Sequence, residues 1–265
     1  MGWTDWTDLV PFTDHFQIRQ YVGHTLRRRD WQTTLEENSD YLSTAEGLWP
    51  VAGGKFDFED TDVIPDVSKI PVGVYFIRIE GGENHTKSGF FDYIGMAEPH
   101  KDPNPRKFQV GIFQRAYDHY RKIVGIPHRG NIGRLISKGY PDLHERSERV
   151  KKFKDQNFRN YEELREFFDN CDRDGKIQDI PNQFRNLTEV FRDELKTFED
   201  IKKFFGTKVR FSYNLYSGAS GANAAKQIAK AEGLALLAYK NKYKEIPYLN
   251  DANELKSLER FNEII

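Results

Sequence analysis

The sequence predicts an α+β fold in which a small, three-stranded antiparallel sheet is flanked by helices. Residues 72–79 and 90–95 are rich in β-branched and aromatic side chains, and a turn-rich stretch separates them, which predicts a β-hairpin. Residues 208–216 alternate in polarity, which is typical of a third strand. Apolar residues recur at helical spacing over 107–123 and from about 222 to 243, so a helix is expected after the hairpin and another after the third strand.

Further segments are predicted around these elements. An N-terminal extension covers residues 1–70 and includes a short helix at 13–22 with an Asp or Thr cap. The core domain covers residues 71–250, and a helical insertion at 124–206 interrupts it. The insertion is assigned from its mixed charge and helical periodicity. Residues 251–265 are predicted to form a C-terminal tail helix.

The composition predicts a cytoplasmic protein that does not enter membranes. Aromatic residues make up 14% of the chain, which favours a packed core over disorder. The single cysteine, Cys171, cannot form an internal disulfide, so an intracellular setting is expected. No apolar run is long enough to cross a bilayer, and the first residues lack the basic and apolar regions of a signal peptide.

Basic residues are concentrated in one part of the chain, although the net charge is −1. Residues 1–70 carry 6 Lys and Arg against 13 Asp and Glu, whereas residues 101–138 carry 9 against 2. A basic zone of this kind is an electrostatic footprint for a polyanion. The alternative is a solvated surface on which the charge varies locally.

Glu232 is the most informative acidic residue. It is the only charged residue between Lys230 and Lys240, and its neighbours are apolar, so we expect its helix to be buried on most faces. A buried carboxylate is costly unless it meets a cation, a metal ion or several hydrogen-bond donors. Glu232 is therefore a candidate ligand for a hard metal ion such as Mg²⁺. The alternative is a partly exposed glutamate, or one that pairs with a structural arginine.

Arg115, His119, two tyrosines and Asn250 complete the set of candidate site residues. Arg115 and His119 are four residues apart, so they share one helix face, where arginine suits a phosphate and histidine can relay a proton. Each candidate also has an ordinary explanation. Tyr75 and Tyr93 could pack across the strands, and Asn250 could cap a helix.

The order and spacing of these motifs resemble the GIY-YIG nuclease superfamily, and most closely its type II restriction endonucleases. The motifs are Gly-Val-Tyr at 73–75, Tyr-Ile-Gly at 93–95, the pair Arg115 and His119, Glu232, and Pro-Tyr-Leu-Asn at 247–250. The resemblance covers residues 72–123 and 208–250. The loop between the tyrosine motifs is longer than usual, and the insertion has no counterpart in minimal members.

The resemblance implies a metal-dependent DNA endonuclease that leaves 5′-phosphate and 3′-hydroxyl ends. Glu232 would hold one Mg²⁺ or Mn²⁺, and Arg115 would bind the scissile phosphate. Tyr75 would act as general base, and Tyr93 would contact the phosphate or position water. His119 would assist proton transfer. Asn250 would orient another group of the site.

The expected partner is double-stranded DNA, and a homodimer is expected because restriction enzymes that cut palindromes usually act as dimers. Phosphate contacts are expected from basic residues around the Arg115 helix, namely Lys101, Arg106, Lys107, Arg121, Lys122, Arg129 and Arg134. Two other functions stay open. The chain could be a non-catalytic DNA-binding protein on the same fold, or a repair or mobile-element nuclease.

Overall fold

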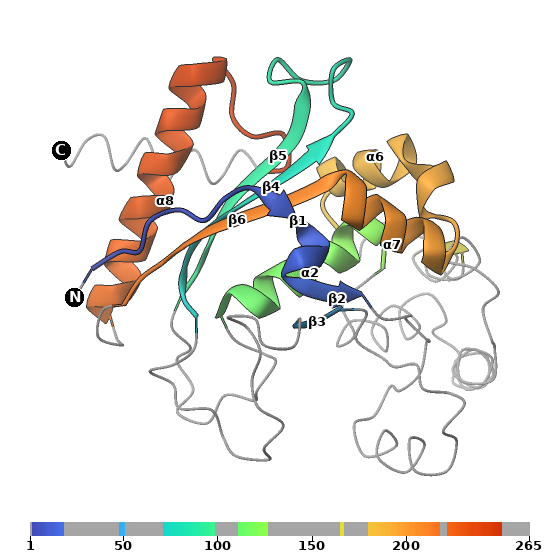
Figure 1. The fold of residues 1–265 in the computed structure, drawn as a ribbon. Helices are drawn as coiled ribbons and strands as arrows, with labels where there is room; N and C mark the ends of the chain where they lie inside the picture. The colour runs from blue at the N-terminus through green and yellow to red at the C-terminus, as the bar shows by residue number, and fades with distance from the viewer. Residues whose placement is uncertain are drawn as a thin grey trace, which may run out of the picture. The chain divides into compact units, whose positions relative to one another are not determined.

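The computed structural model describes residues 2–18, 48–50, 71–98, 111–126, 165–166, 180–217 and 222–250. These residues form a mixed α+β structure (Figure 1). The strands are β1 (Val10–Pro11), β2 (Phe16–Ile18), β3 (Leu48–Pro50), β4 (Gly73–Glu80), β5 (Phe90–Ala97) and β6 (Val209–Leu215). The helices are α2 (Gly111–Val124), α6 (Asn182–Val190), α7 (Phe198–Thr207) and α8 (Ala222–Tyr243), with short 3-10 helices η1 (Phe12–Asp14) and η4 (Arg192–Leu195).

The chain divides into two compact units. The first contains Met1–Gln17, Pro50–Ala116 and Phe205–Ile265, and it includes the main sheet and α8. The second contains Ile18–Trp49 and Tyr117–Phe204. In the second unit, the Thr188 hydroxyl of α6 donates to the Ile123 carbonyl of α2 at 3.0 Å, which joins these two helices. A helical insertion was expected at residues 124–206. The described part of this segment contains α6, η4 and most of α7.

The main sheet confirms the predicted hairpin and third strand, but it has four strands rather than three. Its order is β1-β6-β4-β5, and all neighbours are antiparallel. The additional strand is β1, which pairs with β6 through Val10 opposite Phe211. Before β1, the amides of Thr4 and Thr7 donate to the carbonyls of Leu215 and Tyr213 at 2.9 and 3.0 Å. The N-terminal segment therefore satisfies backbone groups of β6 that an edge strand would leave unpaired.

The short helix predicted at 13–22 is wrong for the described residues, which end at Ile18. The chain instead forms the single turn η1 and then β2, which pairs with β3. Phe12 and Phe16 both enter an aromatic cluster, with ring centroids 5.8 and 5.2 Å from that of Phe211. Their spacing of four residues fits a helix, but tertiary packing overrides a weak local preference.

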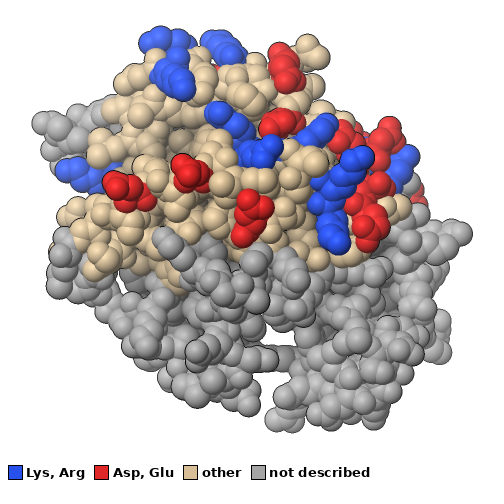
Figure 2. Space-filling view, in the orientation of Figure 1, with Lys and Arg blue, Asp and Glu red and all other residues tan. Residues whose placement is uncertain are grey.

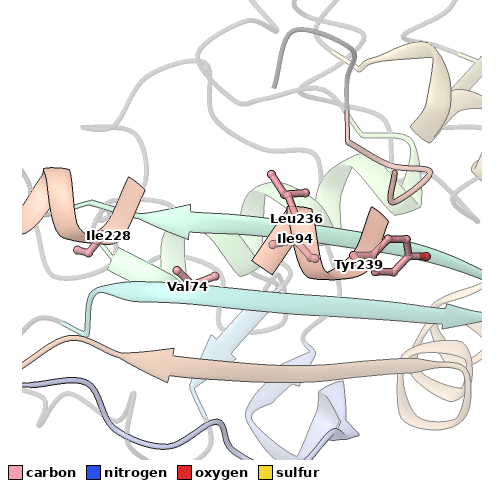
Figure 3. Close-up of a cluster of buried hydrophobic side chains, with 5 residues drawn as sticks. All are labelled: Val74, Ile94, Ile228, Leu236 and Tyr239. Atoms are coloured by element: carbon pink, nitrogen blue, oxygen red, sulfur yellow. The ribbon is translucent and has the colours of Figure 1, made fainter. Parts of the chain in front are cut away.

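Helix α8 lies against one face of the sheet, and its bounds agree with the predicted helix. Strand residues alternate between the faces, so Val74 and Ile94 point toward α8 whereas Tyr75 and Tyr93 belong to the opposite face. The core between sheet and helix consists of Val74, Ile94, Ile228, Leu236 and Tyr239 (Figure 3). After Tyr243 the helix ends at Lys244, which has a φ of 59° and donates its amide to the Lys240 carbonyl at 2.8 Å.

A buried carboxylate fixes α8 to the hairpin. Asp92 of β5 is fully buried, and Arg78 of β4 donates to both of its oxygens at 2.9 and 2.8 Å. The Tyr239 hydroxyl of α8 donates to the same carboxylate at 2.9 Å. Arg78 also donates to the Tyr243 hydroxyl at 3.4 Å, one helical turn further along. Bidentate arginine-carboxylate pairs are among the strong hydrogen-bonded contacts, so this group defines how the helix is seated.

We predict that Asp92→Asn destabilises the protein by about 3 kcal/mol, because it leaves the Arg78 charge beside a neutral amide in a buried setting. Urea unfolding monitored by circular dichroism measures this loss. Asp193→Asn is the matched control, because Asp193 pairs with Lys196 at 2.7 Å on an exposed helix surface. Equal midpoints for the two variants would contradict the structural role of Asp92.

Candidate functional site

Two tyrosines form the centre of the candidate site, on the sheet face opposite α8. Tyr75 of β4 lies opposite Gly95 of β5, and Tyr93 lies opposite Ile77. The two phenol rings are therefore diagonal neighbours on one face. Their centroids are 6.0 Å apart and their planes differ by 29°. The hairpin thus presents two stacked phenols side by side.

Gly95 provides the space that the two rings occupy. A Cβ atom at this position would lie 2.4 Å from Cε1 of Tyr93 and 2.7 Å from the hydroxyl oxygen of Tyr75. The Tyr75 ring consequently leans across the backbone of Gly95. At the same open end of the hairpin, Gly73 has a φ of 152°, and a Cβ there would lie 2.1 Å from the Asn214 carbonyl oxygen. Both glycines of the tyrosine motifs are thus required by close packing.

Arg115 and Glu232 are brought to the same phenol by the fold. Burial raises the pKa of Tyr75 well above 10.0, and the neighbouring Tyr93 adds to this rise. The positive charge of Arg115 opposes the rise, whereas the negative charge of Glu232 increases it. Charges from α2 and α8 therefore both act on the Tyr75 phenol, although Glu232 approaches the sheet from the α8 face and Tyr75 belongs to the opposite face. Tyr75, Tyr93, Arg115 and Glu232 all belong to the first compact unit.

The four side chains differ in how far solvent reaches them. Tyr75 is 1% exposed, whereas Arg115 is exposed and Tyr93 and Glu232 are half-buried. An incoming anion would therefore meet Arg115 before it met Tyr75. The start of α2, which carries Arg115, is tied to the segment before β4 because the Ile112 amide donates to the Pro71 carbonyl at 3.0 Å.

Glu232 occupies a sheet-facing position of α8. It lies four residues after Ile228 and four before Leu236, and both of these side chains are buried against the sheet. The expectation that α8 is buried on most faces is wrong, because Leu234 is 51% exposed. The helix is buried only along the stripe that contacts β4 and β5. A carboxylate within that stripe is unusual, because apolar residues fill the neighbouring turns.

Asn250 is buried and holds the backbone of the second tyrosine motif. Its side-chain nitrogen donates to the Ile94 carbonyl at 2.7 Å, and its side-chain oxygen accepts from the Ile94 amide at 2.9 Å. The Leu249 amide also donates to the Asp92 carbonyl at 3.0 Å. Asn250 therefore acts on the strand beside Tyr93 as a positioning residue rather than as a group that touches substrate.

His119 follows Arg115 by one turn of α2 and is assigned to the second compact unit. It is 3% exposed, and its ring stacks on Phe184 of α6 with centroids 5.6 Å apart. Two expected DNA contacts lie on the same part of α2. Arg121 is 6% exposed and donates to Asp118 at 3.2 Å, so its charge is compensated within the helix. This burial makes Arg121 a poor phosphate ligand.

Lys122 is half-buried, and its ammonium group lies 5.4 Å from the centroid of the Phe184 ring. The other expected DNA contacts, Lys101, Arg106, Lys107, Arg129 and Arg134, lie outside the described residues. The predicted tail helix at 251–265 lies outside them as well.

Sequence reasoning missed two groups near the site. Asp92 could have been noticed, because it is a single charged residue between two aromatic residues of a strand. His15 gave no such signal. Its ring centroid lies 5.3 Å from that of Tyr213, which is directly opposite Tyr75 in the sheet. The contact joins segments far apart in sequence, so no local pattern reveals it.

Comparison with known proteins finds no matching family model, no matching curated protein and no matching solved structure. Among the described residues, no helix is long and apolar enough to span a membrane. Function is therefore inferred from the geometry of the site and from the motifs that it contains.

We predict that Gly95→Ala destabilises the protein by about 1–3 kcal/mol, because the added methyl group forces the two phenol rings apart. Thermal unfolding measures the loss, and near-ultraviolet circular dichroism reports the changed tyrosine environment. Gly206→Ala in α7 is the control, because its nearest neighbour, Thr13 Oγ1, would be 3.5 Å away. If Gly95→Ala were as stable as Gly206→Ala, the close packing would be contradicted.

We further predict that Glu232→Gln lowers the pKa of Tyr75 and that Arg115→Gln raises it. Glu232 favours the neutral phenol and Arg115 favours the phenolate, so each variant removes one of two opposed effects. NMR titration of ¹³Cζ-labelled tyrosine measures the change, with Tyr75→Phe for assignment. Glu245→Gln is the control, because the Glu245 charge raises the pKa of Tyr239 instead. A Tyr75 titration that neither site variant moves would show that these charges do not meet.

Proposed function

We propose that this protein is a metal-dependent DNA endonuclease of the GIY-YIG type, acting in restriction or another defence against foreign DNA. One observation supports the proposal most strongly. The charges of Arg115 and Glu232, from helices far apart in sequence, act on the same buried phenol in the sheet. Core packing is enough to explain a tyrosine in a strand. It does not explain why a carboxylate and a guanidinium both act on that tyrosine.

Arg115 is suited to bind the scissile phosphate. Its guanidinium is exposed, so a DNA strand can reach it without displacing the core. The planar fork of arginine matches two phosphate oxygens and stays charged at every physiological pH. A fixed positive charge beside the reacting phosphorus stabilises the negative charge that develops in the transition state.

Glu232 fits a magnesium ion that is bound together with substrate. The described residues contain no group of three His, Cys, Asp or Glu side chains that could hold an ion, so a closed protein site of the zinc type does not fit them. Mg²⁺ instead keeps several waters and is commonly held by one or two carboxylates and a phosphate. When bound, such a cation polarises the phosphoryl oxygen and assists departure of the leaving oxygen. In this proposal Glu232 supplies such a carboxylate.

The two phenols take different roles in this proposal. Because the pKa of Tyr75 is raised, its phenol keeps its proton at neutral pH and is a poor general base while Glu232 is negatively charged. Tyr75 is also in hydrogen-bond contact with Tyr93, so it can orient the second phenol. Tyr93 is the more accessible of the two and is the better candidate to contact the phosphate or the attacking water. Compensation of the Glu232 charge would remove one of the effects that raise the pKa of Tyr75, of which burial is the largest.

The burial of Tyr75 favours a second candidate function, a non-catalytic DNA-binding protein on the same fold. A phenol that is 1% exposed has no direct path to a substrate water. In that case the side chains of the site would serve packing, and Glu232 would not be needed for any reaction. Cleavage assays separate the two functions.

We predict that the protein cuts plasmid DNA in the presence of Mg²⁺ and not in EDTA. Arg115→Ala should reduce the cleavage rate by about 10²-fold or more, because a preorganised charge at the phosphate is lost. Glu232→Gln should abolish cleavage while DNA binding persists. Gel analysis of methylated and unmethylated plasmid measures cleavage, and ligation of the products tests for 5′-phosphate and 3′-hydroxyl ends.

Glu245→Gln is the matched control for Glu232→Gln. Glu245 follows the same helix, but its carboxylate accepts from the amides of Lys87 and Ser88 at 3.0 and 2.8 Å, away from the phenols. It should cut as the parent does. DNA binding without cleavage, unchanged in Glu232→Gln, would favour the non-catalytic function instead.

A further inference from the structure

Helix α8 presents a row of lysines on its outer side. Lys226, Lys230 and Lys240 are all exposed. With 100° per residue, these three side chains project within about 80° of one another around the helix axis. They are turned away from Ile228 and Tyr239, which face the sheet. We call Lys226, Lys230 and Lys240 the α8 lysine stripe.

The end of the same helix is also basic. Lys242 lies in its last turn, and Lys244 follows it; both side chains are exposed. Figure 2 shows basic side chains gathered at the top of the view, where α8 ends in Figure 1. The end of α8 therefore adds exposed positive charge beyond the stripe.

The carboxylates closest in sequence do not pair with this row within the helix. Glu232 is the only acidic residue between Lys226 and Lys244. It is half-buried in the sheet-facing stripe, where its charge acts on Tyr75. Glu245, just beyond the helix, is engaged by the backbone amides of Lys87 and Ser88. The outer side of α8 therefore carries positive charge with no acidic partner from the helix itself.

We propose that the α8 lysine stripe binds the phosphate backbone of duplex DNA. The inference rests on the proposed function and adds a contact surface outside the basic zone at 101–138. From Lys226 to Lys240 the helix rises about 21 Å, which exceeds the width of about 12 Å of the major groove, so the stripe reaches phosphates on both of its sides. Lysine contacts of this kind position a duplex without reading its sequence.

The α8 lysine stripe and Glu232, the candidate metal ligand, lie on the same helix. Tyr239 is hydrogen-bonded to Asp92 of the sheet at 2.9 Å, so α8 is fixed against the hairpin that carries the phenols. A backbone held on the stripe is therefore held at a constant distance from Glu232.

The test compares two charge-matched double variants in DNA binding. Lys226→Gln with Lys230→Gln removes two charges from the stripe, and Lys202→Gln with Lys203→Gln removes two exposed charges from α7, where Glu199 and Asp200 are close in sequence. Glutamine keeps a similar helix preference, so both variants should fold. Fluorescence anisotropy with a labelled duplex in EDTA measures affinity across a series of KCl concentrations, without cleavage.

We expect the stripe variant to bind more weakly, with a slope of log affinity against log salt concentration reduced by about two, close to one per lost phosphate contact. The α7 variant should keep the parent slope. An unchanged slope in the stripe variant, or an equal reduction in both variants, would overturn the inference. Circular dichroism and thermal unfolding of each variant establish that the fold is intact.

The binding series, taken together with the plasmid cleavage assay in Mg²⁺, separates this inference from the proposed function. Parent protein that cuts DNA while the stripe variant binds normally overturns the inference and leaves the nuclease in place. Parent protein that binds through the stripe but does not cut supports the inference and removes the nuclease. Parent protein that neither binds nor cuts overturns both.

Discussion

The buried carboxylate of Asp92 is the contact on which the first compact unit depends. It accepts from Arg78 within the hairpin and from Tyr239 on α8, so one side chain joins two strands to a helix that follows them by well over one hundred residues. A buried ion pair offers modest net stability, because desolvation offsets much of the attraction. Its directional hydrogen bonds do, however, fix the helix at one rotation and one height. The place of Glu232 on the sheet follows from this seating.

The opposite face of the sheet carries a second constraint, which is space. Two phenol rings share the area above Gly95, and no other residue type would leave room for them. Asn250 then holds the backbone of Ile94 between Tyr93 and Gly95 through a pair of hydrogen bonds. The tyrosine motifs thus depend on two features. Gly95 has no side chain that would displace the rings, and the Asn250 amide holds the neighbouring backbone. Such support keeps a site rigid, which preorganised chemistry requires.

Opposed charges at a buried phenol also explain why the roles of the two tyrosines differ. Burial and Glu232 keep the Tyr75 proton in place, whereas Arg115 alone among the charges named here favours its loss. The balance changes with any event that alters the charge of Glu232. The α8 lysine stripe lies on the outer side of the same helix that carries Glu232.

Local patterns were sufficient to predict most of the described elements. Strand-like runs gave β4, β5 and β6, and the apolar run with its flanking charges gave α8 with its bounds, because side-chain periodicity reports directly on which face is buried. The same reasoning failed for β1 and for residues 13–18, where pairing with β6 and an aromatic cluster decide the conformation. Helix spacing placed His119 one turn after Arg115, as α2 has it, but no local pattern predicted that the His119 ring stacks on Phe184 of α6.

The sequence by itself determined the strands β4, β5 and β6, helix α8 and the kinds of side chain available to the site. These follow from residue composition and from the periodicity of apolar residues. Only the tertiary structure decided that Glu232 and Arg115 act on Tyr75, that Arg121 is compensated by Asp118, and that Asn250 serves the backbone. The physical reason is that hydrogen bonds and charges depend on distance in space. Distances between residues so far apart in the chain are set by packing, which no local pattern encodes.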